Sequence, residues 1–175
     1  MSNKQVSNHD NDELLDVVNE NDEVVGQEWR SVIVANNQFY KLRGVWLFLK
    51  NKNGQLWIAR RSIFKKLFPL ALDGSAVGVV AAGESYEQAL KRETLEELNI
   101  DAQGQYRFIG YTQPVNALYA SHVKVYEMDY EGIPPFNTDD ICEGLWLFPQ
   151  EIVSRFEAGE YMKPTLPSLI KKFYL

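Results

Sequence analysis

Three glutamates are spaced so that a single helix would bring their carboxylates together. Glu93, Glu96 and Glu97 stand at positions i, i+3 and i+4, which form one face of an α-helix within an arc of roughly 100°. Like charges at this spacing repel one another by roughly 0.2–0.5 kcal/mol per pair. Because Mg²⁺ and Mn²⁺ prefer carboxylate oxygens, a divalent cation would relieve that repulsion. On the spacing alone, three glutamates on a helix are more often a plain solvated face.

The residues next to the glutamates favour the metal site over the solvated face. Tyr86 and Ala89 project within the same arc as the three glutamates. Leu90, Thr94 and Leu98 form the adjacent row, which we expect to pack on a sheet. A carboxylate cluster beside a core row indicates a cation-binding role.

The helix that carries the cluster is predicted over residues 86–98. Ser85 is a favourable N-cap, and Gln88 three residues later completes a capping box. Asn99 stands where the helix should end, and asparagine adopts the required left-handed conformation second only to glycine.

The wider spacing resembles the Nudix box. Gly78, five residues, Glu84, seven residues and then Arg92-Glu93-x-x-Glu96-Glu97-x-x-Ile100 keep the first glycine, every charged position and the last aliphatic residue. Thr94 replaces an aliphatic residue and Asn99 replaces a glycine. Both changes are mild, since threonine retains a methyl group and asparagine tolerates the left-handed turn. The order of the surrounding strands also resembles the family, over residues 13–160.

The resemblance implies a Nudix fold, an α/β (α+β) domain in which a mixed β-sheet lies between helices. It implies a small-molecule diphosphate as substrate, and dimers are frequent in the family, so a homodimer is possible. Arg92 and Glu84 would pair to hold the loop against the helix. The ligands of Mg²⁺ or Mn²⁺ would be the carbonyl of Gly78 and the carboxylates of Glu93, Glu96 and Glu97.

The reaction implied is attack of water on phosphorus in a diphosphate linked to another group, such as a nucleoside diphosphate joined to a second moiety. Phosphoryl transfer depends on positioning and charge neutralisation, and a carboxylate would take the proton of the water. The catalytic candidates are Glu93, Glu97 and Glu143. Glu143 is included because Nudix enzymes often recruit an acidic residue from a late loop, although a plain surface role is equally compatible.

A run of basic residues flanks the box on its N-terminal side. Arg60, Arg61, Lys65 and Lys66 are candidates to meet the substrate phosphates. Such a run is also typical of a solvated loop, so both interpretations stay open.

Residues 57–62 and 73–78, with the N-terminal extension, resemble the Nudix proteins similar to isopentenyl-diphosphate isomerase. That enzyme needs a catalytic cysteine and histidine metal ligands. Val77, Val79 and Leu42 stand at the matching positions here, so isomerase chemistry is the weaker alternative. A Nudix module that binds diphosphates without turnover is the other alternative, and retention of all three glutamates favours an enzyme.

The elements that must position the cluster are read from hydrophobic periodicity and turn signals. Helices are predicted over 27–35, 86–98, 150–157 and 165–173, and loops over 61–75 and 131–140. Strands are predicted over 14–18, 23–25, 39–49, 55–60, 76–80, 106–111, 117–129 and 144–148. Residues 1–12 are expected to form a disordered tail, and residues 13–175 a single domain.

Composition limits the partners of this 175-residue chain. A net charge of −6 argues against polymeric nucleic acid. One cysteine, Cys142, excludes an intramolecular disulfide. The polar N-terminus does not resemble a secretory signal, and the apolar runs are too short to span a bilayer. We therefore expect a cytoplasmic protein without a membrane partner.

Overall fold

The computed structural model describes residues 12–114 and 120–175. The helices are α1 (Arg30–Ala35), α2 (Tyr86–Leu98), α3 (Pro149–Glu157) and α4 (Thr165–Phe173), with a 3₁₀ turn, η2, at Phe39–Lys41. The strands are β1 (Leu14–Val18), β2 (Val24–Trp29), β3 (Arg43–Lys50), β4 (Leu56–Arg61), β5 (Leu72–Asp73), β6 (Ala76–Val79), β7 (Tyr106–Thr112), β8 (His122–Asp129) and β9 (Ile141–Leu147). In the described part of the chain, none of these helices has the length and apolarity needed to cross a bilayer.

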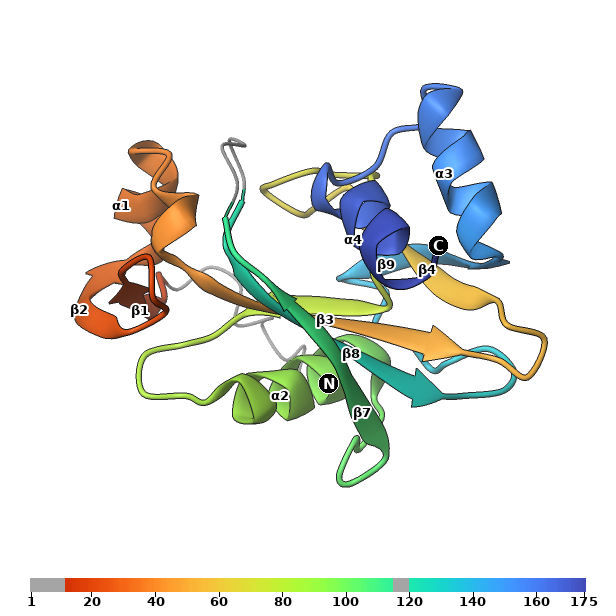
Figure 1. Ribbon diagram of the computed structural model, residues 1–175, viewed down its shortest axis with the longest axis horizontal. Coiled ribbons are helices and arrows are strands. Elements are labelled where there is room, and N and C mark those ends of the chain that lie inside the picture. The colour runs from red at the N-terminus through yellow and green to blue at the C-terminus, as the bar shows by residue number, and fades with distance from the viewer. Residues whose placement is uncertain (1–11, 115–119) are drawn as a thin grey trace, which may run out of the picture.

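Seven strands form one mixed sheet between two layers of helices (Figure 1). The order is β5-β4-β3-β8-β7, with β6 also paired to β3 and β9 to β4; β3 and β8 run parallel and the other pairs antiparallel. Helix α2 covers one face, and α3 and α4 cover the other (Figure 1). The predicted mixed α+β architecture is confirmed.

Strand β3 shows why the sheet needs helices on both faces. Val45, Leu47 and Leu49 belong to the core cluster that contains the buried residues of α2. Trp46 and Phe48 belong to the cluster that contains the buried residues of α3 and α4. Successive side chains on a strand point to opposite faces, so this continuous apolar run is buried from both sides. Because β6 also pairs with β3, its Gly78 lies at the face covered by α2.

Helix α2 begins and ends where its local signals place it. The Ser85 side chain accepts a hydrogen bond from the backbone amide of Gln88, whose own side chain accepts one from the backbone amide of Ser85. Asn99 follows with a φ of 53°, in the left-handed region. The predicted bounds are confirmed, which fixes the direction in which the glutamates project.

The hairpin of β1 and β2 lies against the loop that joins β6 to α2. Asp16 Oδ2 accepts a hydrogen bond from the backbone amide of Gly83 at 2.9 Å. Asp22 Oδ2 accepts one from the hydroxyl of Tyr86, the first residue of α2, at 2.9 Å. The hairpin therefore supports the segment that leads into the glutamate helix.

Two predicted elements near the N-terminus are wrong at their starts. The helix predicted over 27–35 begins only at Arg30, because Gln27, Glu28 and Trp29 pair with β1 and extend β2. The strand predicted over 39–49 begins at Arg43, because the 3₁₀ turn η2 takes its first residues. In the first case sheet pairing overrides the local helical pattern.

Three later predictions also need correction. Residues 72–73, predicted as loop, form β5 by pairing with β4. Strand β9 begins at Ile141 rather than at residue 144, so Glu143 is a strand residue paired with β4 rather than a loop residue. Strand β8 begins at His122 rather than at residue 117. Residues 115–119, and the predicted tail except for its last residue, lie outside the described residues.

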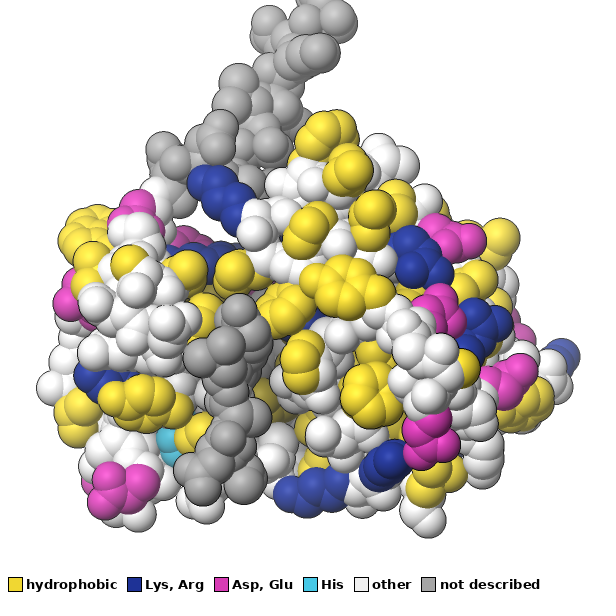
Figure 2. Space-filling model, turned by 90° about the horizontal axis from the view of Figure 1, so that it is seen from above, with side chains coloured by type: hydrophobic (Ala, Val, Ile, Leu, Met, Phe, Trp, Pro, Cys, Tyr) yellow, Lys and Arg dark blue, Asp and Glu magenta, His cyan; other side chains and the backbone are white. Residues whose placement is uncertain are grey.

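The face seen in Figure 2 carries basic and acidic side chains interspersed among hydrophobic ones. Polymeric nucleic acid is usually bound by a continuous basic surface. The basic side chains on this face do not form a continuous surface of that kind.

Candidate metal and active site

The carboxyl group of Glu93 lies in the space that a side chain at position 78 would occupy. A Cβ atom at Gly78 would lie 1.8 Å from Glu93 Cδ and 1.9 Å from Oε1. The carboxylate of Glu93, on α2, thus lies directly against the backbone of β6. This close approach, possible only with glycine, brings a carboxylate and a strand backbone to one point.

Of the three helix glutamates, Glu97 is buried and Glu93 is mostly buried. The side chains of Glu93 and Glu97 are 12% and 10% exposed. Burial raises the pKa of Glu93 to about 8; the Glu97 carboxylate contributes and the Arg92 guanidinium opposes the shift. Burial also raises the pKa of Glu97, against the opposing effects of Lys65 and the Val77 amide. Buried carboxylates that resist ionisation are stabilised as anions by a cation.

Glu96 lies at the rim of the same helix face. Its side chain is 52% exposed, and Arg92 Nη1 approaches its Oε2 at 3.5 Å. Arg92 Nη1 also contacts Glu93 Oε1 at 2.7 Å. Among residues 12–114 and 120–175, no three His, Cys, Asp or Glu side chains are gathered closely enough to hold a metal ion as they stand. The oxygen donors of these side chains are of the kind that suits a hard divalent cation.

Arg92 fastens the loop after β6 to the helix. Its Nε and Nη2 donate to Glu84 Oε1 and Oε2 at 2.8 and 2.9 Å, and Nη2 also donates to the Val79 carbonyl at 3.0 Å. Glu84 Oε2 accepts a further hydrogen bond from the Ala81 amide at 3.0 Å. The Arg92 guanidinium beside Glu84 lowers the pKa of that carboxyl. The planar guanidinium thus joins α2 to the loop at Glu84 and to the end of β6 at Val79. The single ammonium group of a lysine could not make all of these contacts.

We expect Arg92→Lys to lower the free energy of unfolding by about 1–3 kcal/mol, because an ammonium cannot keep both Glu84 oxygens and the Val79 carbonyl paired. Urea unfolding of the metal-free protein measures the effect. Arg30→Lys is the matched control, since Arg30 and its partner Glu13 are 46% and 38% exposed and such pairs contribute little. Equal stabilities for the two variants would contradict this role of Arg92.

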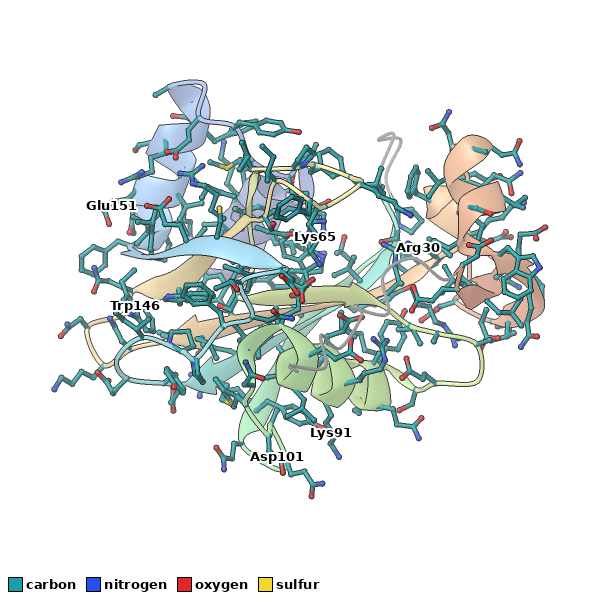
Figure 3. The ribbon with its side chains drawn as sticks, turned by 180° about the vertical axis from the view of Figure 1, so that it is seen from behind. Arg30, Lys65, Lys91, Asp101, Trp146 and Glu151 are labelled. Carbon is teal, nitrogen blue, oxygen red and sulfur yellow. The ribbon has the colours of Figure 1, made fainter. Side chains whose placement is uncertain are left out.

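A second set of charged side chains adjoins Glu97. Lys65 Nζ lies 2.5 Å from Asp140 Oδ1 and 3.4 Å from Glu97 Oε1. Asp73 Oδ2 is contacted by Arg61 Nη1 at 2.8 Å and by Lys163 Nζ at 3.1 Å. We call these side chains the charge network. It consists of three cations and three carboxylates: Arg61, Lys65, Lys163, Asp73, Glu97 and Asp140. Figure 3 shows Lys65 near the middle of the molecule and Lys91 of α2 at its lower edge.

Three members of this network, Asp73, Asp140 and Lys163, were not predicted from the sequence. Asp140 is 1% exposed and comes from a loop with no motif. Lys163 lies over the Trp46 ring, 4.9 Å from its centroid, and is placed by the bridge between Leu72 and Met162. Neither position carries a local signal, because each partner is remote in the sequence.

Arg60 and Glu143, two further predicted site residues, pair with each other rather than with the residues of the charge network. Arg60 contacts Glu143 Oε2 at 2.7 Å and Glu160 Oε1 at 3.0 Å. The Glu143 side chain is 51% exposed. Lys66 is exposed. The structure therefore joins Arg61 and Lys65 to the glutamate helix, and it pairs Arg60 with Glu143.

Comparisons with known proteins agree with this geometry. A profile of the NUDIX domain matches residues 40–169. The chain is 43% identical over 164 residues to a Nudix hydrolase of Deinococcus radiodurans, covering 93% of this chain and 95% of that protein. It is 42% identical over 165 residues to the uncharacterized Nudix hydrolase all7351 of Nostoc, covering 93% and 96%. The crystal structure of DR0079 from Deinococcus radiodurans superposes with a TM-score of 0.87 at 43% identity, covering 93% of this chain and 100% of that one.

Proposed function

The chain belongs to the Nudix family and is a Nudix hydrolase, and we propose that it hydrolyses the diphosphate linkage of a small molecule with the help of Mg²⁺ or Mn²⁺. The observation that carries the proposal is the buried pair of carboxylates, Glu93 and Glu97, one of which lies against the backbone of Gly78. Buried anions in such proximity are stabilised by a cation.

In this proposal the ion is held by the Gly78 carbonyl and by the carboxylates of Glu93, Glu96 and Glu97. A bound divalent ion would polarise the phosphate oxygens and lower the pKa of the attacking water. The chain itself supplies the proton acceptor. We place that role at a carboxylate oxygen of Glu93, which lies against the backbone of Gly78 and would be held as an anion by the bound ion. Glu143 is the weaker candidate because its carboxylate is engaged with Arg60.

We infer that the charge network takes part in recognising a diphosphate only together with the bound metal. Its three cations and three carboxylates nearly cancel, so the network alone has little excess charge to hold an anion. A divalent cation beside Glu97 would supply the missing positive charge. Arg61 and Lys65 would then face the phosphate oxygens, with charge-assisted hydrogen bonds of the kind that favour phosphate.

Two alternatives are less well supported. Isomerase chemistry on an allylic diphosphate would need a cysteine close to the box, and the single cysteine, Cys142, lies in β9 with its Sγ near the carbonyls of Arg60 and Arg61. A binding module without turnover does not require the three glutamates, all of which are retained.

A panel of diphosphates, assayed with Mg²⁺, with Mn²⁺ and with chelator, tests the proposal. We expect at least one nucleoside diphosphate derivative, nucleotide sugar, dinucleotide or isoprenoid diphosphate to be hydrolysed only when metal is present. Incorporation of ¹⁸O from labelled water into a phosphate product shows attack on phosphorus. Binding without any product would favour the non-catalytic module. Conversion of isopentenyl diphosphate to its isomer would favour the isomerase.

A further inference from the structure

We propose that the ammonium group of Lys65, tethered to Asp140, acts as a stand-in for the metal at Glu97 and is displaced from Glu97 when the divalent ion binds. This inference rests on the metal site of the proposed function and deepens it. It makes Lys65 and Asp140 positioning residues: they hold the Glu97 carboxylate in place until the ion arrives.

The burial of the three groups supports this assignment. Side-chain exposure is 18% for Lys65, 10% for Glu97 and 1% for Asp140. An ammonium group is costly to bury unless it is paired, and here it lies between two carboxylates. The shorter contact, 2.5 Å, is to Asp140, and the longer one, 3.4 Å, is to Glu97. Lys65 is therefore held mainly by Asp140, and Glu97 is the partner it can release.

Asp140 is itself fixed by neighbouring segments. Its Oδ2 accepts a hydrogen bond from Asn137 Nδ2 at 2.8 Å, and its carbonyl accepts one from the Ser62 amide at 2.8 Å. The backbone amide of Asn137 donates to the backbone carbonyl of Glu97, also at 2.8 Å. These bonds join the loop of Lys65, the loop of Asp140 and the end of α2. The tether thus stays in place when the flexible lysine stem moves.

Electrostatics gives the displacement its direction. Glu97 Oε2 already accepts a hydrogen bond from the Val77 amide at 3.0 Å, so Oε1, the oxygen near Lys65, is the one left for a cation. A divalent ion bound by Glu97 would repel the Lys65 ammonium, which lies 3.4 Å from Oε1 in the metal-free protein. Asp140 offers that ammonium a second carboxylate close by, so the exchange does not leave a buried charge unpaired.

Calorimetric titration of Mn²⁺ into the full chain tests the inference without measuring turnover. Lys65→Gln keeps a polar side chain but removes the competing charge, and we expect it to bind Mn²⁺ roughly tenfold more tightly. Lys65→Arg keeps the charge and should stay within about twofold of the wild type. Lys52→Gln, on the β3–β4 turn, controls for the change in net charge and should also stay within about twofold.

Asp140→Asn should have the opposite effect. Without its tether the Lys65 ammonium would turn fully onto Glu97, and Mn²⁺ binding should weaken roughly tenfold. Because Asp140 acts through Lys65, the double variant Lys65→Gln/Asp140→Asn should bind Mn²⁺ about as tightly as Lys65→Gln alone. If Asp140 were itself a metal ligand, the double variant would remain weak, and the inference would be overturned.

Lysine-selective ¹H–¹⁵N spectra of the wild type give a readout that needs no variant. We expect Mg²⁺ to shift the Lys65 ammonium resonance and to leave that of Lys52 in place. Unchanged or weaker Mn²⁺ binding by Lys65→Gln, or an unmoved Lys65 resonance at saturating Mg²⁺, would overturn the inference while leaving the metal site intact. A wild-type chain that binds no Mn²⁺ would remove the metal site as well.

Discussion

Glu97→Gln should lower metal-dependent kcat on the order of 10³-fold and leave the fold intact. The amide keeps the shape of the side chain, and its oxygen can still accept the hydrogen bond that the Val77 amide donates at 3.0 Å. The negative charge that would bind the cation is lost. Because burial raises the pKa of Glu97, removing the charge should not lower the melting temperature of the metal-free protein.

The measurement is turnover of the best substrate at saturating Mg²⁺, together with a thermal melt. Glu87→Gln is the matched control on the same helix, since its carboxylate contacts Tyr126 and Lys124 rather than the charge network. The control should keep kcat within about twofold. Wild-type turnover by Glu97→Gln would remove Glu97 from the mechanism.

Gly78→Ala should weaken metal binding roughly 10- to 100-fold, because the added methyl displaces a ligand rather than filling space. The new Cβ would lie 1.8 Å from Glu93 Cδ. The Glu93 side chain cannot move away from the new methyl group without losing its 2.7 Å contact with Arg92. We also expect a loss of about 1–3 kcal/mol in the free energy of unfolding, as for other overpacked sites.

Mn²⁺ titration and urea unfolding measure the two effects of Gly78→Ala separately. Gly26→Ala is the control, because no heavy atom lies within 4 Å of its added Cβ. A variant that loses stability but binds Mn²⁺ as the wild type does would show that Gly78 serves packing alone. The site would then lack its strand ligand.

Local signals predicted the part of the site that lies on one helix. The bounds of α2 follow from Ser85, Gln88 and Asn99, each of which acts within four residues of its partner. The direction of the glutamates follows from helical geometry. A motif contained in one element therefore needs no knowledge of the fold.

The rest of the site depends on pairings between distant residues. Lys65 meets Asp140 across 75 positions of the sequence (140 − 65), and only the sheet order brings their loops together. Glu143 was expected in a loop, but pairing of β9 with β4 places it opposite Arg60. Likewise β2 extends through Trp29 because β1 offers a partner strand. Sequence patterns cannot resolve such competition between local propensity and strand pairing.

The N-terminal hairpin supports the glutamate helix from outside the region that the family profile matches. The family profile starts at residue 40, yet Asp16 and Asp22 hold the amide of Gly83 and the hydroxyl of Tyr86. The region matched by the profile therefore leaves out two contacts that hold the segment leading into the glutamate helix. The hairpin that supplies them begins at Leu14, more than twenty residues before the profile does.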